Sequence, residues 1–93
     1  MAVTEQSIRE TLRGWILTNL LAGEDPESVD DSTPLVTSGV VTSLSLLELV
    51  TFIEETWSLR FEEEDLGVSR LDSVDLMVAL VRERLEADSP PRG

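Results

Sequence analysis

The chain has no cysteine and no histidine, and because all seven of its basic residues are arginine it has no lysine either. Without cysteine there can be no disulfide, no thiolate nucleophile and no cysteine metal site. Without histidine there is no histidine-dependent catalytic triad, and the usual general base at neutral pH is missing. A small enzyme is therefore the weakest hypothesis for this sequence.

Aromatic residues are also scarce, at 4% of 93 residues, whereas hydrophobic residues make up 41%. This length supports one small domain, placed here at residues 1–87, with an aliphatic core and Trp15 and Trp57 as its large fillers. Residues 88–93 offer nothing to bury and are predicted to form a disordered tail. No apolar run reaches membrane-spanning length and no signal-peptide pattern is present, so we expect a cytoplasmic protein without a membrane partner.

Acidic side chains outnumber basic ones by nineteen to seven, which gives a net charge of -12. Nucleic acid is not expected as a partner, because binding it requires a basic patch that neutralises phosphates. A negative field instead favours encounter with basic patches on other proteins, although acidity that only maintains solubility is the simpler explanation. No metal site is predicted, since the carboxylates are expected on exposed faces.

Hydrophobic periodicity predicts three long helices. The first runs from Thr4, a plausible N-cap, to about Leu21, the second from Ser43 to about Trp57, and the last from the cap Ser73 to about Ala87. The side chains predicted to face the core are Ile8, Leu12, Trp15, Ile16 and Leu20 in the first helix, Leu46, Leu47, Val50, Ile53 and Trp57 in the second, and Val74, Met77, Val78, Val81 and Leu85 in the last.

The connections between these helices differ in character. Residues 22–42 are rich in turn-forming residues and predict a long loop, whose second half Leu35, Val36, Val40 and Val41 are expected to pin down. The acidic run 62–66 either opens a short third helix ending near Gly67 or remains a loop. The predicted fold is therefore all-α, a small four-helix bundle of three long helices and a short third one.

The junction Gly39-Val40-Val41-Thr42-Ser43-Leu44 is the most informative segment of the chain. A serine at a helix start is ordinarily an N-cap. Winding the second helix at about 100° per residue leaves a narrow stripe opposite the core, formed by Leu44, Glu48, Thr51 and Glu55. An apolar Leu44 beside Ser43 and away from the core suits a docking surface. Ser43 itself needs an outside base to react, because the chain has neither histidine nor lysine.

This junction resembles the phosphopantetheine attachment site of the acyl and peptidyl carrier protein family. The resemblance extends over nearly the whole chain, from the first amphipathic helix through Asp31-Ser32-Thr33-Pro34-Leu35 to Leu71-Asp72-Ser73-Val74. It implies that a separate phosphopantetheinyl transferase moves 4′-phosphopantetheine from coenzyme A onto Ser43. It further implies a carrier that catalyses nothing and whose installed thiol holds an acyl or aminoacyl group as a thioester.

The resemblance also implies a partner-recognition surface, formed by Leu44, Glu48, Thr51, Glu54 and Glu55. For the glutamates alone, an ordinary solvated helix face is the simpler interpretation.

Two features complicate the site assignment. Thr42 occupies the position where many family members have aspartate, which leaves open which transferase recognises the site. Ser45 is also followed by leucine and is a rival to Ser43. Its spacing from Gly39 fits the family less well, and its spacing to Glu48 matches a capping box. Ser43 is therefore the favoured site.

The function expected from the resemblance is that of a freestanding, monomeric carrier in polyketide or nonribosomal peptide biosynthesis. Its expected partners are the transferase, an acyl- or aminoacyl-loading enzyme, and a ketosynthase, condensation or other tailoring enzyme. The alternatives are a fatty-acid or D-alanyl carrier, or an acidic helical adaptor without a prosthetic group. The sequence does not indicate the cargo.

Overall fold

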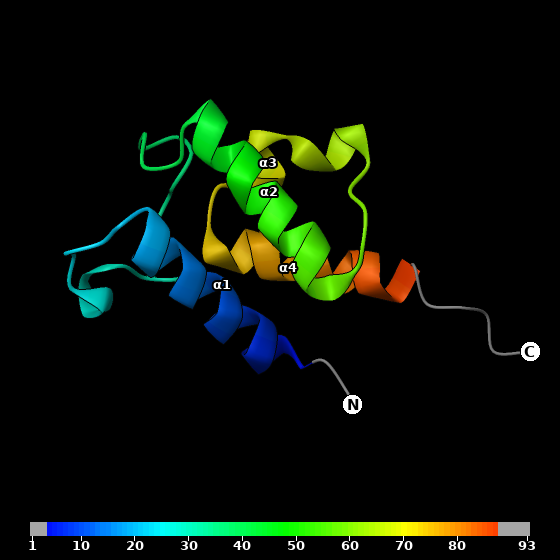
Figure 1. Ribbon diagram of the computed structural model, residues 1–93, viewed down its shortest axis with the longest axis horizontal. Helices are drawn as coiled ribbons and strands as arrows, with labels where there is room; N and C mark the ends of the chain where they lie inside the picture. Colours follow the sequence, from blue (N-terminus) through cyan, green and yellow to red (C-terminus); the bar gives the residue numbers. More distant parts are fainter. Residues whose placement is uncertain (1–3, 88–93) are drawn as a thin grey trace, which may run out of the picture.

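The computed structural model describes residues 4–87, which are all-helical and contain no strand within that range (Figure 1). The α-helices are α1 (Glu5–Asn19), α2 (Ser43–Trp57), α3 (Val68–Leu71) and α4 (Val74–Ala87), and 3₁₀ turns lie at Pro26–Ser28 and Glu63–Leu66. The all-α class, the three long helices and the long first loop are confirmed. The predicted tail at 88–93 lies outside the described residues.

The starts of α1 and α4 are fixed by local capping, as predicted. Thr4 Oγ1 accepts the backbone N–H of Ser7 at 3.1 Å, and Ser7 Oγ accepts the N–H of Thr4 in return. Ser73 Oγ accepts the N–H of Leu76 at 3.2 Å at the start of α4. Each hydroxyl satisfies a donor that has no partner inside its helix.

The acidic run after α2 forms a 3₁₀ turn, and the short α3 begins after Gly67 rather than ending near it. Asp65 stabilises this turn, because its carboxylate accepts the N–H of Glu62 at 2.8 Å and lies 3.3 Å from Arg84. The extended backbone of Gly67 then separates the turn from α3. Both helical pieces are short, and a 3₁₀ turn followed by one α-helical turn is a common connector.

The core is aliphatic and contains side chains from all four helices and from the long loop. Its buried members are Ile8, Leu12, Ile16, Leu35, Val41, Leu49, Val50, Ile53, Leu59, Leu71, Val74, Met77, Val78, Leu80 and Val81. Helix α4 is central to this arrangement, since both α1 and α3 pack against it. No helix within residues 4–87 is long and apolar enough to cross a membrane.

Two predictions about the core need correction. Leu47 was predicted to face the core, but its side chain is 64% exposed, whereas the neighbouring Leu49 is fully buried. Leu49, Val50 and Ile53 form the buried face of α2, so that helix is rotated relative to the prediction. In α4, Leu80 is also fully buried although it was not predicted to be.

The tryptophans lie at the border of the core rather than in its centre. Trp15 and Trp57 are half-buried, and both meet Phe52. Trp15 stacks on Phe52 with ring centroids 5.3 Å apart, and Trp57 meets the same ring edge-on at 6.3 Å. These offset and edge geometries are the ones that aromatic pairs prefer, and they join α1 to α2.

Candidate modification site at the start of α2

Thr42, not Ser43, caps α2. The Thr42 backbone is extended, its carbonyl oxygen accepts the N–H of Leu46 at 2.8 Å, and its Oγ1 accepts the N–H of Ser45 at 3.3 Å. The expectation of a cap at Ser43 is therefore wrong by one residue. Ser43 is instead the first residue of the helix, where a side chain points outward without a capping role.

The Ser43 hydroxyl is exposed and makes no hydrogen bond to any residue between 4 and 87. The backbone N–H groups of Ser43 and Leu44 likewise have no acceptor within this range. Two free N–H groups at the positive end of a 15-residue helix favour a negative group such as a phosphate. The Ser43 hydroxyl thus lies where a phosphate ester would be stabilised by the helix that carries it.

The rival Ser45 is in a different environment. Its side chain is half-buried, and its Oγ accepts a hydrogen bond from Thr42 Oγ1 at 3.2 Å. The predicted capping box between Ser45 and Glu48 is not formed, because Thr42 occupies the capping position. An outside enzyme would have to break this contact to reach Ser45, whereas the Ser43 hydroxyl is already accessible.

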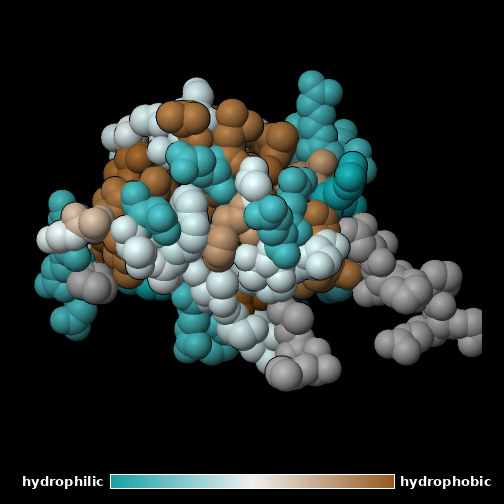
Figure 2. Space-filling model, viewed as in Figure 1, coloured by the Kyte–Doolittle hydropathy of each residue, from teal (hydrophilic) through white to brown (hydrophobic). Residues whose placement is uncertain are grey.

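Apolar side chains surround the start of α2. Figure 2 shows hydrophobic side chains gathered at the top of the view, over the start of α2 and over α3. The exposed large hydrophobic residues of these two helices are Leu44 at 70%, Leu47 at 64% and Val68 at 45%. Two exposed leucines thus lie within the first two turns of one helix, as a docking surface requires.

The stripe predicted opposite the core of α2 is exposed along its length, at Leu44, Glu48, Thr51 and Glu55. Glu54 differs from these residues. It is half-buried, and its Oε2 accepts the N–H of Phe61 at 2.9 Å, so this carboxylate holds the connection that follows α2. Glu54 therefore has a structural contact that the sequence did not indicate.

A shallow groove of ≈ 450 Å³ runs between this stripe and α1. Its lining combines the exposed Leu47, the aromatic pair of Trp15 and Phe52, and polar side chains, and consists of Trp15, Asn19, Leu47, Glu48, Thr51, Phe52 and Glu55. Leu47 lines this wall because α2 is rotated relative to the prediction. Sequence analysis missed it for that reason.

The loop leading to Ser43 is fixed by a carboxylate from the corner between α3 and α4. Asp72, between α3 and α4, accepts the backbone N–H groups of Leu35, Val36 and Thr37 at 3.2, 2.8 and 2.9 Å. Its second oxygen accepts the Thr37 hydroxyl at 2.9 Å. These bonds, led by the one from the Thr37 N–H, lower the pKa of Asp72 below its ordinary value.

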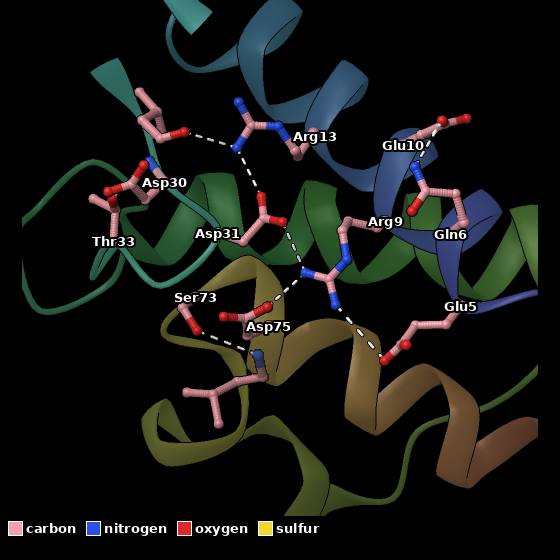
Figure 3. Close-up of polar contacts among 12 residues, drawn as sticks. Glu5, Gln6, Arg9, Glu10, Arg13, Asp30, Asp31, Thr33, Ser73 and Asp75 are labelled. Carbon is pink, nitrogen blue, oxygen red and sulfur yellow. Dashed lines mark hydrogen bonds and ion pairs between the residues drawn. The ribbon is translucent and has the colours of Figure 1, made fainter. Parts of the chain in front are cut away.

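The first half of the same loop is held by charge (Figure 3). Arg9 and Arg13 of α1 each place one nitrogen 2.8 Å from the carboxylate of Asp31, and the same nitrogen of Arg9 lies 2.5 Å from Asp75. Burial raises the pKa of Asp31, but the hydrogen bonds from the two guanidinium groups outweigh it and lower the pKa overall. The same contacts, with Asp75 first, raise the pKa of Arg9.

The described part of the chain holds no group of three or more carboxylates that could bind a metal ion. Its chemistry at Ser43 is therefore that of an accessible hydroxyl beside free backbone donors and exposed leucines, with no base at hand. Comparison with known proteins adds no assignment, because no family model and no curated protein sequence matches this chain.

Proposed function

We propose that this chain is a freestanding carrier protein and that Ser43 is the acceptor of 4′-phosphopantetheine. The observation that carries the proposal is the exposed, unbonded Ser43 hydroxyl at the start of α2, next to the exposed Leu44. In this proposal the four helices form the small bundle that the resemblance to carrier proteins implies.

The chemistry of attachment requires a second protein. A phosphopantetheinyl transferase takes the proton from Ser43 Oγ. This oxygen then forms a bond to the phosphorus of coenzyme A that bears the pantetheine group, and adenosine 3′,5′-bisphosphate leaves. The free N–H groups of Ser43 and Leu44 would stabilise the resulting phosphodiester. When bound, the group supplies a thiol for thioester formation, which no side chain of this cysteine-free sequence can provide.

The surface around Ser43 is proposed to receive the partner enzymes. Leu44 would enter an apolar site on the partner, while Glu48 and Glu55 would face basic side chains around it. Thr51 lies between these glutamates along α2, and Glu54 contributes its charge although its carboxylate also holds Phe61. Thr42 would contribute to the choice of transferase, because it is an uncharged neighbour of the modified serine.

The proposed pathway class is polyketide or nonribosomal peptide biosynthesis in the cytoplasm, with the carrier acting as a monomer. A loading enzyme would attach the acyl or aminoacyl group, and a ketosynthase, condensation or other tailoring enzyme would consume it. A fatty-acid or D-alanyl carrier would use the same Ser43 chemistry with different partners.

Intact-mass spectrometry after incubation with coenzyme A and a broad-specificity transferase tests this proposal. Wild type is expected to gain one phosphopantetheine group, and Ser43→Ala is expected to gain none. The matched control is Ser45→Ala, which removes the neighbouring serine and should still be modified. An unmodified wild type would contradict the carrier function, whereas modification of Ser43→Ala would contradict only the site.

One observation favours a second candidate function. The groove between α1 and α2 combines Leu47, Trp15 and Phe52 with the charges of Glu48 and Glu55. An acidic adaptor that binds a basic, partly apolar segment would use the same wall without any prosthetic group. The mass experiment separates the two functions, because an adaptor is not modified.

A further inference from the structure

We propose that Asp72 is a positioning residue for Ser43, which presents the modification site to the transferase by fixing the loop that enters α2. This inference rests on the proposed carrier function. Asp72 is 29 positions from Ser43 in the sequence and belongs to the corner between α3 and α4. It acts on Ser43 through a continuous series of contacts.

The first step is the attachment of the loop to Asp72. One oxygen of the carboxylate accepts three successive backbone N–H groups, from Leu35 to Thr37, and the other accepts the Thr37 hydroxyl. The backbone carbonyl oxygen of Asp72 also accepts the Leu35 N–H, at 2.6 Å. Backbone donors cannot swing away as long side chains do, so this arrangement fixes the direction of the chain as well as its place.

The second step closes the loop upon itself. The carbonyl oxygen of Leu35 accepts the N–H of Val41 at 2.9 Å, and that of Val36 accepts the N–H of Gly39 at 3.1 Å. Gly39 has a φ of +88°, a left-handed conformation that residues with a side chain rarely adopt. Leu35 and Val41 are 1% and 3% exposed, so both ends of this small loop are anchored in the core.

The third step connects the closed loop to the site. Val41 is followed directly by Thr42, whose hydroxyl caps α2, and then by Ser43. The position of Val41 therefore sets where Thr42 caps α2 and where the Ser43 hydroxyl is exposed. Without the Asp72 carboxylate, the N–H groups of Val36 and Thr37 lose their acceptor, so the loop that places Val41 and the cap gains freedom, and the transferase must order it on binding.

The test measures KM and kcat of a phosphopantetheinyl transferase for wild type, Asp72→Ala and Asp72→Asn. Asp72→Ala is expected to raise KM by about tenfold with a smaller change in kcat, since disorder in the free carrier weakens binding before chemistry. Asp72→Asn keeps an uncharged acceptor oxygen for the three N–H groups and is expected to restore KM to within about threefold of wild type.

Amide hydrogen exchange on the same variants reports positioning without any enzyme. In Asp72→Ala, exchange should accelerate at Val36 and Thr37 while the amides of α1 and α4 keep their protection. The matched control is Asp31→Ala, which removes a second half-buried, hydrogen-bonded aspartate, one that holds the first half of the same loop. It should leave both the transferase KM and the exchange of these two amides unchanged.

Each outcome bears on the inference. An unmodified wild type would overturn the carrier function and this role together, whereas a modified wild type with an unchanged KM in Asp72→Ala would overturn only the role of Asp72. Equal acceleration of exchange in α1 and α4 would show general destabilisation and would also overturn it. If Asp72→Ala does not fold, Thr37→Val removes one bond from an exposed position and should raise KM by about twofold.

Discussion

The two halves of the long loop between α1 and α2 are each held by one aspartate, but in opposite ways. In the first half, Asp31 belongs to the loop and receives the guanidinium groups of Arg9 and Arg13 from α1. In the second half, Asp72 belongs to the bundle and receives backbone N–H groups of the loop. The first half is thus held mainly by paired charges, with one backbone bond from the Asp75 N–H to the Asp31 carbonyl oxygen at 2.9 Å, and the second half by its own main chain.

The difference extends to burial. Val29 in the first half is only half-buried, whereas Leu35 and Val41 in the second half are core residues. Ion pairs made by long arginine side chains allow the loop some movement at little cost. Backbone hydrogen bonds to Asp72, next to the buried Leu35 and Val41, allow less. The rigid half is the one that leads directly to Ser43, so the structure fixes most firmly the part of the loop nearest to the candidate site.

The largest expected effect comes from removing the apolar anchor of the second half. Leu35→Ala should lower the free energy of unfolding by about 2–5 kcal/mol, because it leaves a cavity in a small core. Val29→Ala in the first half should lower it by about 1 kcal/mol or less, since a half-buried valine loses less contact area. Urea denaturation followed by circular dichroism measures both values. Equal losses would show that the two halves are anchored alike.

Local signals predicted the parts of this fold that depend on neighbouring residues. Thr4 and Ser73 were identified as caps because their hydroxyls meet donors only three positions away. The orientation of α2 was not predictable in the same way. Leu46, Leu47 and Leu49 are all leucines on adjacent faces, and only packing against the other helices decides that Leu49 is buried and Leu47 exposed.

The candidate site was predictable to about the same extent. The exposure of the stripe that begins at Leu44 followed from helical periodicity. The cap was misplaced by one residue because Thr42, Ser43 and Ser45 all have hydroxyls suited to capping. The hydrogen bonds from Leu35, Val36 and Thr37 to Asp72 left no local signal, since these partners lie 35–37 positions earlier in the chain than Asp72.

A smaller loss of unfolding free energy is expected when the ion pairs of the first half of the loop are removed. Asp31→Ala leaves Arg9 and Arg13 without their shared partner and should lower the free energy of unfolding by about 1–2 kcal/mol, between the values for exposed and buried pairs. The loss should shrink as sodium chloride is raised from low concentration to about 1 M, because salt screens partly exposed charges. Denaturation series at the two salt concentrations measure this change. A loss that does not depend on salt would contradict the assignment of the Asp31 contribution to partly exposed charge pairs.

The smallest change in unfolding free energy is expected for Asp72→Asn, which keeps a side-chain oxygen as acceptor for the loop N–H groups and removes only the charge. The pKa of Asp72 is lowered in the folded state, so its carboxylate contributes stability above its ordinary pKa of 3.8. That contribution is lost as the pH falls through the folded pKa. Wild type should therefore be more stable than Asp72→Asn at pH 7, by less than the loss in Asp31→Ala.

Unfolding free energies measured between pH 7 and pH 3 distinguish this contribution from that of Asp31. The pKa of Asp31 is also lowered, but Asp31 is present in both proteins, so its acid sensitivity cancels in the difference between wild type and Asp72→Asn. The difference should narrow below about pH 4 and should change little with salt at pH 7, because its donors carry no net charge. If the difference between wild type and Asp72→Asn stays constant with pH, the hydrogen bonds to Asp72 depend on the shape of its side chain rather than on its charge. The contrast with the half of the loop held by Arg9 and Arg13 would then rest on geometry alone.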